Sequence, residues 1–337
     1  IDMRRPYYVC TGLQDNGSWC GPSSVRGEQI LSEDWYRVGG GDGFYTAVDH
    51  TDHQQLFSES QNGNIRRVNL ETGEQISIRP QPPRNDQDSN ISPAPSRDLE
   101  IRWNWNTPFI LSPHNQRVIF AGSNRLFKSL DQGRTWTMSP DLTKNVDRDE
   151  IEIMGQYNSL PRCRPWIRGE ECILSRNDGV SQYSTIVSIA ESTLMPGVLW
   201  VGTDDGNIQL SRDGGNTWTE VGTNIPGGTH NYYVSRVEAS HSDPGRAYAS
   251  LDGPRSDDLR PHIYMTHDFG ETWTSIESDL PSYGNVRTIR EDPQNPDLLY
   301  AGTEFGFYIS LNGGDNWHKF MNNLGTTRID DVIVHPR

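Results

Sequence analysis

The segment SLDQGRTW (Ser129–Trp136) recurs, with changes, as SRDGGNTW (Ser211–Trp218), THDFGETW (Thr266–Trp273) and SLNGGDNW (Ser310–Trp317). Each copy begins with a hydroxyl residue, continues through Asp or Asn and then Gly, and ends on Trp. A motif that returns at spacings of tens of residues is typical of a repeat architecture. The chain is therefore expected to consist of similar units placed side by side.

The residues of this motif, the Asp-box or neuraminidase repeat, all suit a tight turn. Hydroxyl and carboxylate side chains hydrogen-bond nearby backbone N–H groups, and Gly adopts conformations that strain other residues. The Trp begins the next strand and buries its ring. The fourth copy has amides at two of its polar positions, and an amide still caps such a turn. A structural role is predicted for Asp131, Trp136, Asp213, Trp218, Asp268, Trp273, Asn312 and Trp317.

Short strand-like runs surround each box. In the last repeat they read VRTIRED, LLYAGTE, GFYISLN and NWHKFM, and the earlier repeats follow the same order. Alternating apolar and polar residues rich in Val, Ile, Tyr and Trp indicate half-buried antiparallel strands. Four strands per repeat form the blade of a β-propeller. We predict an all-β fold, a β-propeller of four-stranded antiparallel blades with about six blades visible.

Residues 1–337 are expected to form a single propeller region. Both ends fall inside a blade, so we expect a fragment of a larger seven-bladed or tandem propeller. Alternatively, the last strand completes the opening blade and closes a six-bladed ring, which would remove an unpaired edge. The predicted blades are about 7–38 (lacking its first strand), 43–80, 108–139, 185–222, 232–278, 286–320 and 326–337 (first strand only), with insertions at 81–107 and 141–184.

The charge balance and hydropathy limit the kinds of partner. The chain has 45 Asp and Glu against 30 Lys and Arg, a formal net charge of −15. Sequence-independent binding to nucleic acid needs a basic face, so nucleic acid is not expected as a partner. No apolar run approaches the about 20 residues of a membrane-spanning helix. We expect no membrane span here.

The four cysteines form two pairs that are close in sequence, Cys10 with Cys20 and Cys163 with Cys172. Loops of this length suit disulfides, which persist in oxidising compartments. The spacings match no zinc motif, and the histidines show no metal-binding spacing. We therefore predict two disulfides, with free thiols as the alternative, and a secreted, periplasmic or cell-surface location. No metal centre is predicted and no cofactor is required.

Propeller topology separates the loops into two faces. The boxes lie on one face, and the opposite face carries the second-to-third turns, the connections between blades and both insertions. Long ordered loops in compact domains tend to be functional. Trp103 and Trp105, at the end of the 81–107 insertion, are candidates for stacking on a sugar or binding a peptide. Alternatively, one of these rings enters a blade core.

Acidic residues recur at turns of the same face. Paired carboxylates are what glycoside hydrolysis requires, at a separation of about 5–9 Å that depends on whether the configuration is retained or inverted. Carboxylates also suit Ca²⁺, which makes calcium a candidate ligand. Alternatively, Asp beside Gly forms a stable hairpin turn. The catalytic candidates are Asp15, Asp42, Glu59, Asp204, Asp205, Asp252 and Glu304.

Three arginines occur near the starts of predicted first strands, which line the central channel of a propeller. They are Arg236, Arg287 and Arg328. A cluster of guanidinium groups would hold a carboxylate of a ligand. Each is otherwise expected to form an ion pair with one of the acids.

The chain resembles, almost end to end, a family of large secreted bacterial proteins described as glycosyl hydrolase or sortilin-type, with neuraminidase-like repeats. The stretches GLQDNGSWCGPS, DWYRVGGGDGFY, WNWNTPFILSPHN and GVLWVGTDDGNIQLSRDGGNTW carry the resemblance. It implies a propeller fold and further propeller domains in the same chain. It implies less about chemistry, because the repeats behind the hydrolase description are structural.

Three functions remain open. The first is an exported module that presents its loop-rich face to a protein, peptide or glycan. The second is a glycoside hydrolase of sialidase or xyloglucanase type that uses two of the listed acids. Against a sialidase, the expected FRIP-like stretch is absent, and IRP at Ile78–Pro80 is a poor substitute. The third is a passive structural part of a cell-surface assembly.

Overall fold

The computed structural model describes residues 1–337 except 28, 85–87, 148–181, 230 and 336–337. Within these described ranges, regular structure is almost entirely β-strand. In the described part of the chain, helix is limited to three single 3-10 turns, at Ser32–Asp34, Gly222–Asn224 and Pro254–Ser256. The predicted all-β class is confirmed.

The strands form six antiparallel sheets in chain order. The first sheet has three strands: β1 (Tyr8–Leu13), β2 (Gly17–Pro22) and β3 (Tyr36–Gly39). The next two have four strands each: β4 (Gly43–Val48), β5 (Gln55–Ser60), β6 (Asn64–Asn69) and β7 (Gln75–Ser77); then β8 (Phe109–Leu111), β9 (Ile119–Gly122), β10 (Arg125–Ser129) and β11 (Thr137–Asp141).

The last three sheets repeat this up-and-down order with four strands each. They are β12 (Ile186–Glu191), β13 (Leu199–Thr203), β14 (Ile208–Ser211) and β15 (Thr219–Glu220); β16 (Tyr233–Ala239), β17 (Ala247–Asp252), β18 (Ile263–Thr266) and β19 (Thr274–Ser275); and β20 (Val286–Glu291), β21 (Leu299–Thr303), β22 (Gly306–Ser310) and β23 (His318–Lys319).

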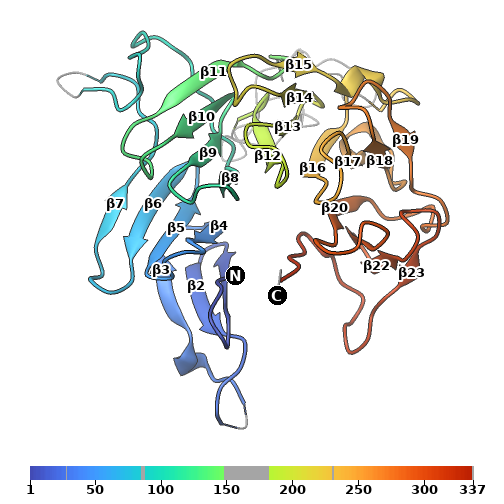
Figure 1. Ribbon diagram of the computed structural model, residues 1–337, viewed down its shortest axis with the longest axis horizontal. Coiled ribbons are helices and arrows are strands. Elements are labelled where there is room, and N and C mark those ends of the chain that lie inside the picture. Colours follow the sequence, from blue (N-terminus) through green and yellow to red (C-terminus); the bar gives the residue numbers. More distant parts are fainter. Residues whose placement is uncertain (28, 85–87, 148–181, 230, 336–337) are drawn as a thin grey trace, which may run out of the picture.

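The sheets are arranged around a common centre, with the first strand of each four-stranded sheet innermost, and both chain ends lie near that centre (Figure 1). The predicted β-propeller fold is confirmed. Residues 326–335, expected to provide the first strand of a further blade, form no strand. They instead run toward the centre, where Asp331 is held by arginine side chains of β16 and β20.

The apolar core lies between neighbouring sheets. Each of the five buried clusters combines residues from two consecutive sheets. In one cluster, for example, Trp200 of β13 packs edge-on against Trp273, which precedes β19, with ring centroids 6.0 Å apart. Burial of these aromatic and aliphatic faces holds each sheet to the next, because a single blade has no core of its own.

The box turns share one hydrogen-bond pattern. In the first box, the backbone N–H of Thr135 donates to Asp131 at 2.9 Å, the Thr135 hydroxyl donates to the same carboxylate at 2.7 Å, and the N–H of Gly133 donates to Ser129 Oγ at 2.8 Å. The boxes at Asp213 and Asp268 repeat these bonds. In the fourth, the amide oxygen of Asn312 accepts the N–H of Asn316 at 3.0 Å. The amide preserves the turn, as expected.

Three of the four box tryptophans tie their sheet to the preceding one. The indole N–H of Trp136 donates to Ile78 O at 2.9 Å, that of Trp273 to Val221 O at 3.0 Å, and that of Trp317 to Ile276 O at 2.8 Å. Trp218 differs, because its N–H bonds the carbonyl of Gly215 in its own turn, at 3.0 Å. The box therefore stabilises a turn and, in three cases, an interface between blades.

The Cys10–Cys20 disulfide is confirmed. The two residues lie directly opposite each other on β1 and β2, with their Cα atoms 4.1 Å apart. The predicted Cys163–Cys172 pair lies outside the described residues. So does most of the 141–184 insertion.

Candidate functional site

A cavity of about 660 Å³ occupies the centre of the propeller. Its lining comes from the innermost strands and from the turns that follow them, together with residues at both chain ends. One wall is apolar and is formed by Phe109, Ile110, Leu111 and Ile189. Charged side chains of β16, β20 and the C-terminal segment form another wall: Arg236, Glu238, Arg290 and Asp331.

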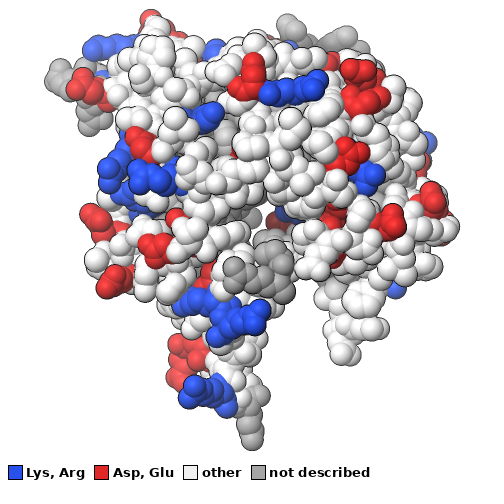
Figure 2. Space-filling model, viewed as in Figure 1, with Lys and Arg blue, Asp and Glu red and all other residues white. Residues whose placement is uncertain are grey.

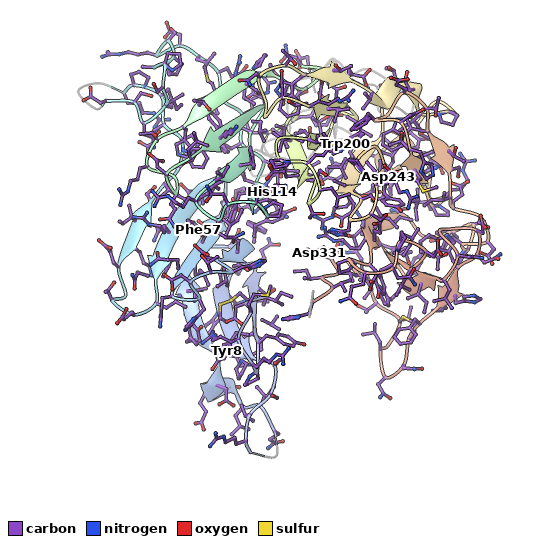
Figure 3. The ribbon with its side chains drawn as sticks, viewed as in Figure 1. Tyr8, Phe57, His114, Trp200, Asp243 and Asp331 are labelled. Carbon is purple, nitrogen blue, oxygen red and sulfur yellow. A yellow bond between two sulfur atoms is a disulfide. The ribbon has the colours of Figure 1, made fainter. Side chains whose placement is uncertain are left out.

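Asp331 lies near the centre around which the sheets are arranged (Figure 3), and it is bound by two guanidinium groups. Arg236 donates to its Oδ1 at 2.7 Å, and Arg290 donates to the same oxygen at 2.9 Å. Burial works against ionisation of Asp331, but the charges of Arg236 and Arg290 outweigh it and hold the pKa of this carboxyl below its ordinary value. The Asp331 carboxylate is therefore negatively charged, and it binds Arg236 and Arg290 inside the cavity.

Arg290 makes two further contacts that connect the wall. Its guanidinium donates to Glu238 at 2.6 Å and, through Nε, to the backbone carbonyl of Val332 at 2.9 Å. The Glu238 side chain is only 9% exposed. Burial would raise the pKa of Glu238, but Arg290, His241 and Arg236 together outweigh burial and the pKa is lowered. Arg290 therefore neutralises a buried acid and also binds the chain segment that runs past it.

β-Bulges determine where these arginines point. The register between β16 and β17 shifts at Val234/Arg236, and that between β20 and β21 shifts at Val286/Thr288, so each innermost strand carries an extra residue near its start. A bulge redirects the side chains beside it. Arg287, the extra residue of β20, faces the second-to-third turns, whereas Arg236 and Arg290 face the cavity.

Arg287 brings together two of the predicted catalytic acids. It forms ion pairs with Asp252 and, at 2.8 Å, with Glu304. Asn285 also donates to Asp252, at 3.0 Å. Burial raises the pKa of Asp252 even though Arg287 lies beside it. Arg287 therefore pairs with two acids of the same chain. This is the alternative given above, in which the arginine forms an ion pair instead of holding a ligand.

Asp204 and Asp205 follow β13 and are both buried. Asp204 accepts hydrogen bonds from the backbone N–H and the hydroxyl of Thr185, at 2.7 and 2.8 Å. Burial, with a contribution from the charge of Asp205, raises the pKa of Asp204 to about 7. Asp205 accepts the N–H of Lys144 at 2.8 Å and the hydroxyl of Thr203 at 2.5 Å. Through these hydrogen bonds, the two carboxylates stabilise the backbone turns around them.

The remaining three acids are also separate from the cavity. Asp42 accepts the backbone N–H of Asp15 at 2.9 Å, while Asp15 itself is exposed. Glu59 is 1% exposed and accepts the N–H of Gly63 at 3.2 Å, and burial raises its pKa well above the ordinary value. None of the seven predicted acids lines the central cavity.

The predicted binding residues have different environments. Trp103 is buried and stacks on Phe127, with centroids 5.4 Å apart, so this ring enters a blade core. Trp105 is 39% exposed. Arg328 forms an exposed ion pair with Asp330 and does not join Arg236.

Sequence reasoning missed Arg290, Glu238 and Asp331. Arg290 and Glu238 lie in innermost strands that carry several charged residues, VRTIRE and VSRVEA, and this charge in strands expected to line the channel was the available signal.

Replacing Asp204 with asparagine is expected to change the pH dependence of stability. The folded pKa of about 7 exceeds the unfolded value of about 3.9, so the folded state holds the extra proton and wild-type stability falls as pH rises between them. Between pH 5 and 7 the wild type should lose about 2 kcal/mol relative to Asp204→Asn. Urea denaturation at each pH measures this difference.

Asp213→Asn is the matched control. Hydrogen bonds from Thr217 lower the pKa of Asp213 to about 2, so its contribution to stability is complete above about pH 4 and is lost only in stronger acid. This variant should therefore run parallel to the wild type from pH 5 to 7. A parallel curve for Asp204→Asn would show that Asp204 is ionised throughout this range.

Charged side chains of both signs are interspersed on the face that Figure 2 shows. On the face seen in Figure 2, Lys and Arg form separate small groups between Asp and Glu. No helix in the described part of the chain has the length and apolarity needed to span a bilayer. Among the described residues, no group of three or more His, Cys, Asp or Glu could hold a metal ion.

The fold and its central cavity define a β-propeller. No family model matches the chain. It is 25% identical over 187 residues to the oligoxyloglucan-reducing end-specific xyloglucanase of Emericella nidulans, a match that covers 52% of this chain and 22% of the enzyme. A probable enzyme of the same description from Neosartorya fischeri is 23% identical over 219 residues, covering 58% of this chain and 24% of that one. The match spans about a quarter of the length of these relatives.

Two solved structures illustrate the similarity of this chain to known folds. An ancestral GH74 enzyme aligns with a TM-score of 0.43 at 18% identity, over 64% of this chain and 24% of that chain. YCF48 from Cyanidioschyzon merolae aligns with a TM-score of 0.49 at 12% identity, over 92% and 85%. The propeller assignment therefore rests on the strand pairing and the arrangement of the sheets.

Proposed function

We propose that this chain is an exported β-propeller binding module that holds an extended acidic peptide segment in its central cavity. One observation carries the proposal: Arg236 and Arg290 hold the carboxylate of Asp331, and Arg290 also holds the carbonyl of Val332. The chain thus places a non-strand segment of its own on the cavity wall. An external peptide with an acidic residue at the equivalent position would make the same contacts.

The composition of the cavity supports a peptide as the ligand. Charge-assisted hydrogen bonds to a carboxylate are among the strongest in proteins, and a guanidinium group also donates to peptide carbonyls. Ile333 and Val334 line the same cavity as the apolar wall, and Ile333 is still 59% exposed. The Cys10–Cys20 disulfide is compatible with the proposed export.

Glycoside hydrolysis is the second candidate, because the curated relatives are xyloglucanases. Six of the seven acids named for this chemistry accept hydrogen bonds from protein groups, and the seventh, Asp15, is exposed. General acid catalysis needs a carboxyl group directed at the substrate. This arrangement favours binding over hydrolysis.

A fluorescent peptide with the sequence of residues 329–334, supplied in trans, tests the proposal. The wild-type cavity already holds this segment, so weak binding is expected. Asp331→Ala removes the internal carboxylate and should bind the peptide at least about ten-fold more tightly, a change of about 1.4 kcal/mol. Asp330→Ala is the control, because Asp330 pairs with Arg328 outside the cavity and its removal should leave binding near wild type.

The same peptide with Asn at the position of Asp331 should not bind Asp331→Ala. If no variant binds the acidic peptide, or if the Asn peptide binds equally well, the proposed function is wrong. Release of sugars from xyloglucan oligosaccharides by the wild type, lost in Asp252→Asn or Asp204→Asn, would establish the hydrolase instead.

A further inference from the structure

The last sheet, β20–β23, carries exposed aromatic rings on the side that faces away from the β16–β19 sheet. Phe320 and Leu324, just after β23, are 48% and 42% exposed. Phe320 packs edge-on against Phe307 of β22, with ring centroids 6.2 Å apart, and Phe307 stacks on Tyr300 of β21 at 6.0 Å. We refer to these four residues as the trailing face.

The equivalent residues of the two preceding sheets are buried. The residues three and seven positions after the box tryptophan are Val221 and Ile225, Ile276 and Leu280, and Phe320 and Leu324. Val221 and Ile225 belong to the cluster shared with the β16–β19 sheet. Ile276 and Leu280 belong to the cluster shared with the β20–β23 sheet. The trailing face is therefore the same kind of surface, without a sheet on top of it.

A backbone acceptor is open in the same place. The carbonyl of Val221 accepts the indole N–H of Trp273 at 3.0 Å, and the carbonyl of Ile276 accepts that of Trp317 at 2.8 Å. Phe320 is the third member of this series, and no donor among the described residues reaches its carbonyl. The trailing face thus combines apolar rings with an acceptor placed for an indole N–H.

The first sheet presents a matching side. Trp35 directly precedes β3, the outer strand, as each box tryptophan directly precedes the outer strand of its own sheet. Cys20 and Val38 pack against the β4–β7 sheet. Gly21 alternates with Cys20 and faces the other way, where a Cβ on it would lie 2.3 Å from the Trp35 ring. We refer to this side, which also carries the exposed Leu13, as the leading face.

The leading face offers the donor that the trailing face lacks. In the described part of the chain, the indole N–H of Trp35 donates to no group. Figure 1 shows β2 and β3 separated from β22 and β23, and no buried cluster of the described residues joins the first and last sheets. Both faces are therefore open to another molecule.

The geometry points to head-to-tail self-association, in which the trailing face of one copy of this chain binds the leading face of a second copy. The indole N–H of Trp35 donates to the carbonyl of Phe320 in the other copy, which repeats the bond that joins consecutive sheets within the chain. Burial of the exposed rings favours the contact. Since two different faces meet, assemblies grow beyond the dimer unless the rotation closes a ring.

Analytical ultracentrifugation of the intact chain over a range of concentrations tests this contact. The wild type should form species larger than the monomer, in amounts that rise with concentration. Phe320→Asp places a charge in the contact and should weaken association at least about ten-fold. Trp35→Ala should weaken it as well, and Leu13→Asp repeats the test of the leading face at an exposed residue. Leu130→Asp is the control, because this exposed leucine of a box turn lies on neither face and its variant should associate as the wild type does.

A mixture of two variants distinguishes head-to-tail contact from contact between like faces. Phe320→Asp keeps the leading face and Trp35→Ala keeps the trailing face, so an equimolar mixture should form one-to-one heterodimers and nothing larger. Contact between two trailing faces would leave this mixture without heterodimers, because Phe320→Asp has lost that face. Sedimentation of the mixture beside each variant alone measures the difference.

Three outcomes would overturn the proposal. These are a wild type that stays monomeric up to about 0.1 mM, unchanged association in Phe320→Asp, and a mixture that forms no heterodimer. A monomer would also be the result if the two faces closed on each other within one chain. The experiment is independent of peptide binding, because none of the substituted residues lines the central cavity.

Discussion

Replacing Trp136 with alanine is expected to lower the free energy of unfolding by about 3–5 kcal/mol. The ring is 1% exposed and belongs to the cluster that joins the β4–β7 sheet to the β8–β11 sheet. Its N–H donates to Ile78 O, so truncation removes apolar burial, leaves a cavity and frees a buried carbonyl. Urea denaturation followed by circular dichroism measures the loss.

Trp218→Ala provides the comparison. This box tryptophan is only partly buried, and its N–H bonds its own turn, so its removal should cost less than half as much. Trp136→Phe retains most of the ring and removes the donor, for a loss of about 1–2 kcal/mol. Equal losses in Trp136→Ala and Trp218→Ala would show that these boxes stabilise their own turns and add nothing at the interface between blades.

Arg290→Met is expected to destabilise the fold by about 3–5 kcal/mol, because the buried Glu238 loses its guanidinium partner at 2.6 Å and keeps only the His241 imidazole at 3.6 Å. Methionine keeps much of the apolar stem, so the loss reports the charge more than the volume. Asp331 retains Arg236 as a partner, and the effect therefore comes mainly from Glu238. Thermal and urea unfolding of the purified variant measure it.

Two variants separate this explanation from simple packing. Arg328→Met removes an arginine from an exposed pair with Asp330 and should change stability by less than about 1 kcal/mol. The double variant Glu238→Gln/Arg290→Met removes the stranded charge and should recover much of the loss. If the double variant is no more stable than Arg290→Met, packing of the arginine stem is responsible.

The repeat fold could be predicted because its signals are local. Asp131 and Thr135 lie four residues apart and bind each other within one turn, so the box is visible in eight letters of sequence. The strands around it alternate with a period of two. Cys10 and Cys20 were predictable for the same reason, because a short hairpin places them opposite each other.

The site was less predictable, and the acids show why. Asp next to Gly has the same appearance in a turn and in a catalytic site, and only tertiary contacts show that Thr185 holds Asp204 and that Arg287 holds Glu304. Trp103 and Trp105 are two residues apart, yet one is buried in a core and the other is 39% exposed.

By itself, the sequence determined the β-strands, the box turns and the class of fold, since these depend on contacts between residues that are close along the chain. Only the tertiary structure decided which charges meet. Arg236, Arg290 and Asp331 come from two different blades and the C-terminal segment, and β-bulges direct the two arginines into one cavity. Contacts across such distances in sequence depend on how whole sheets pack, which no short pattern records.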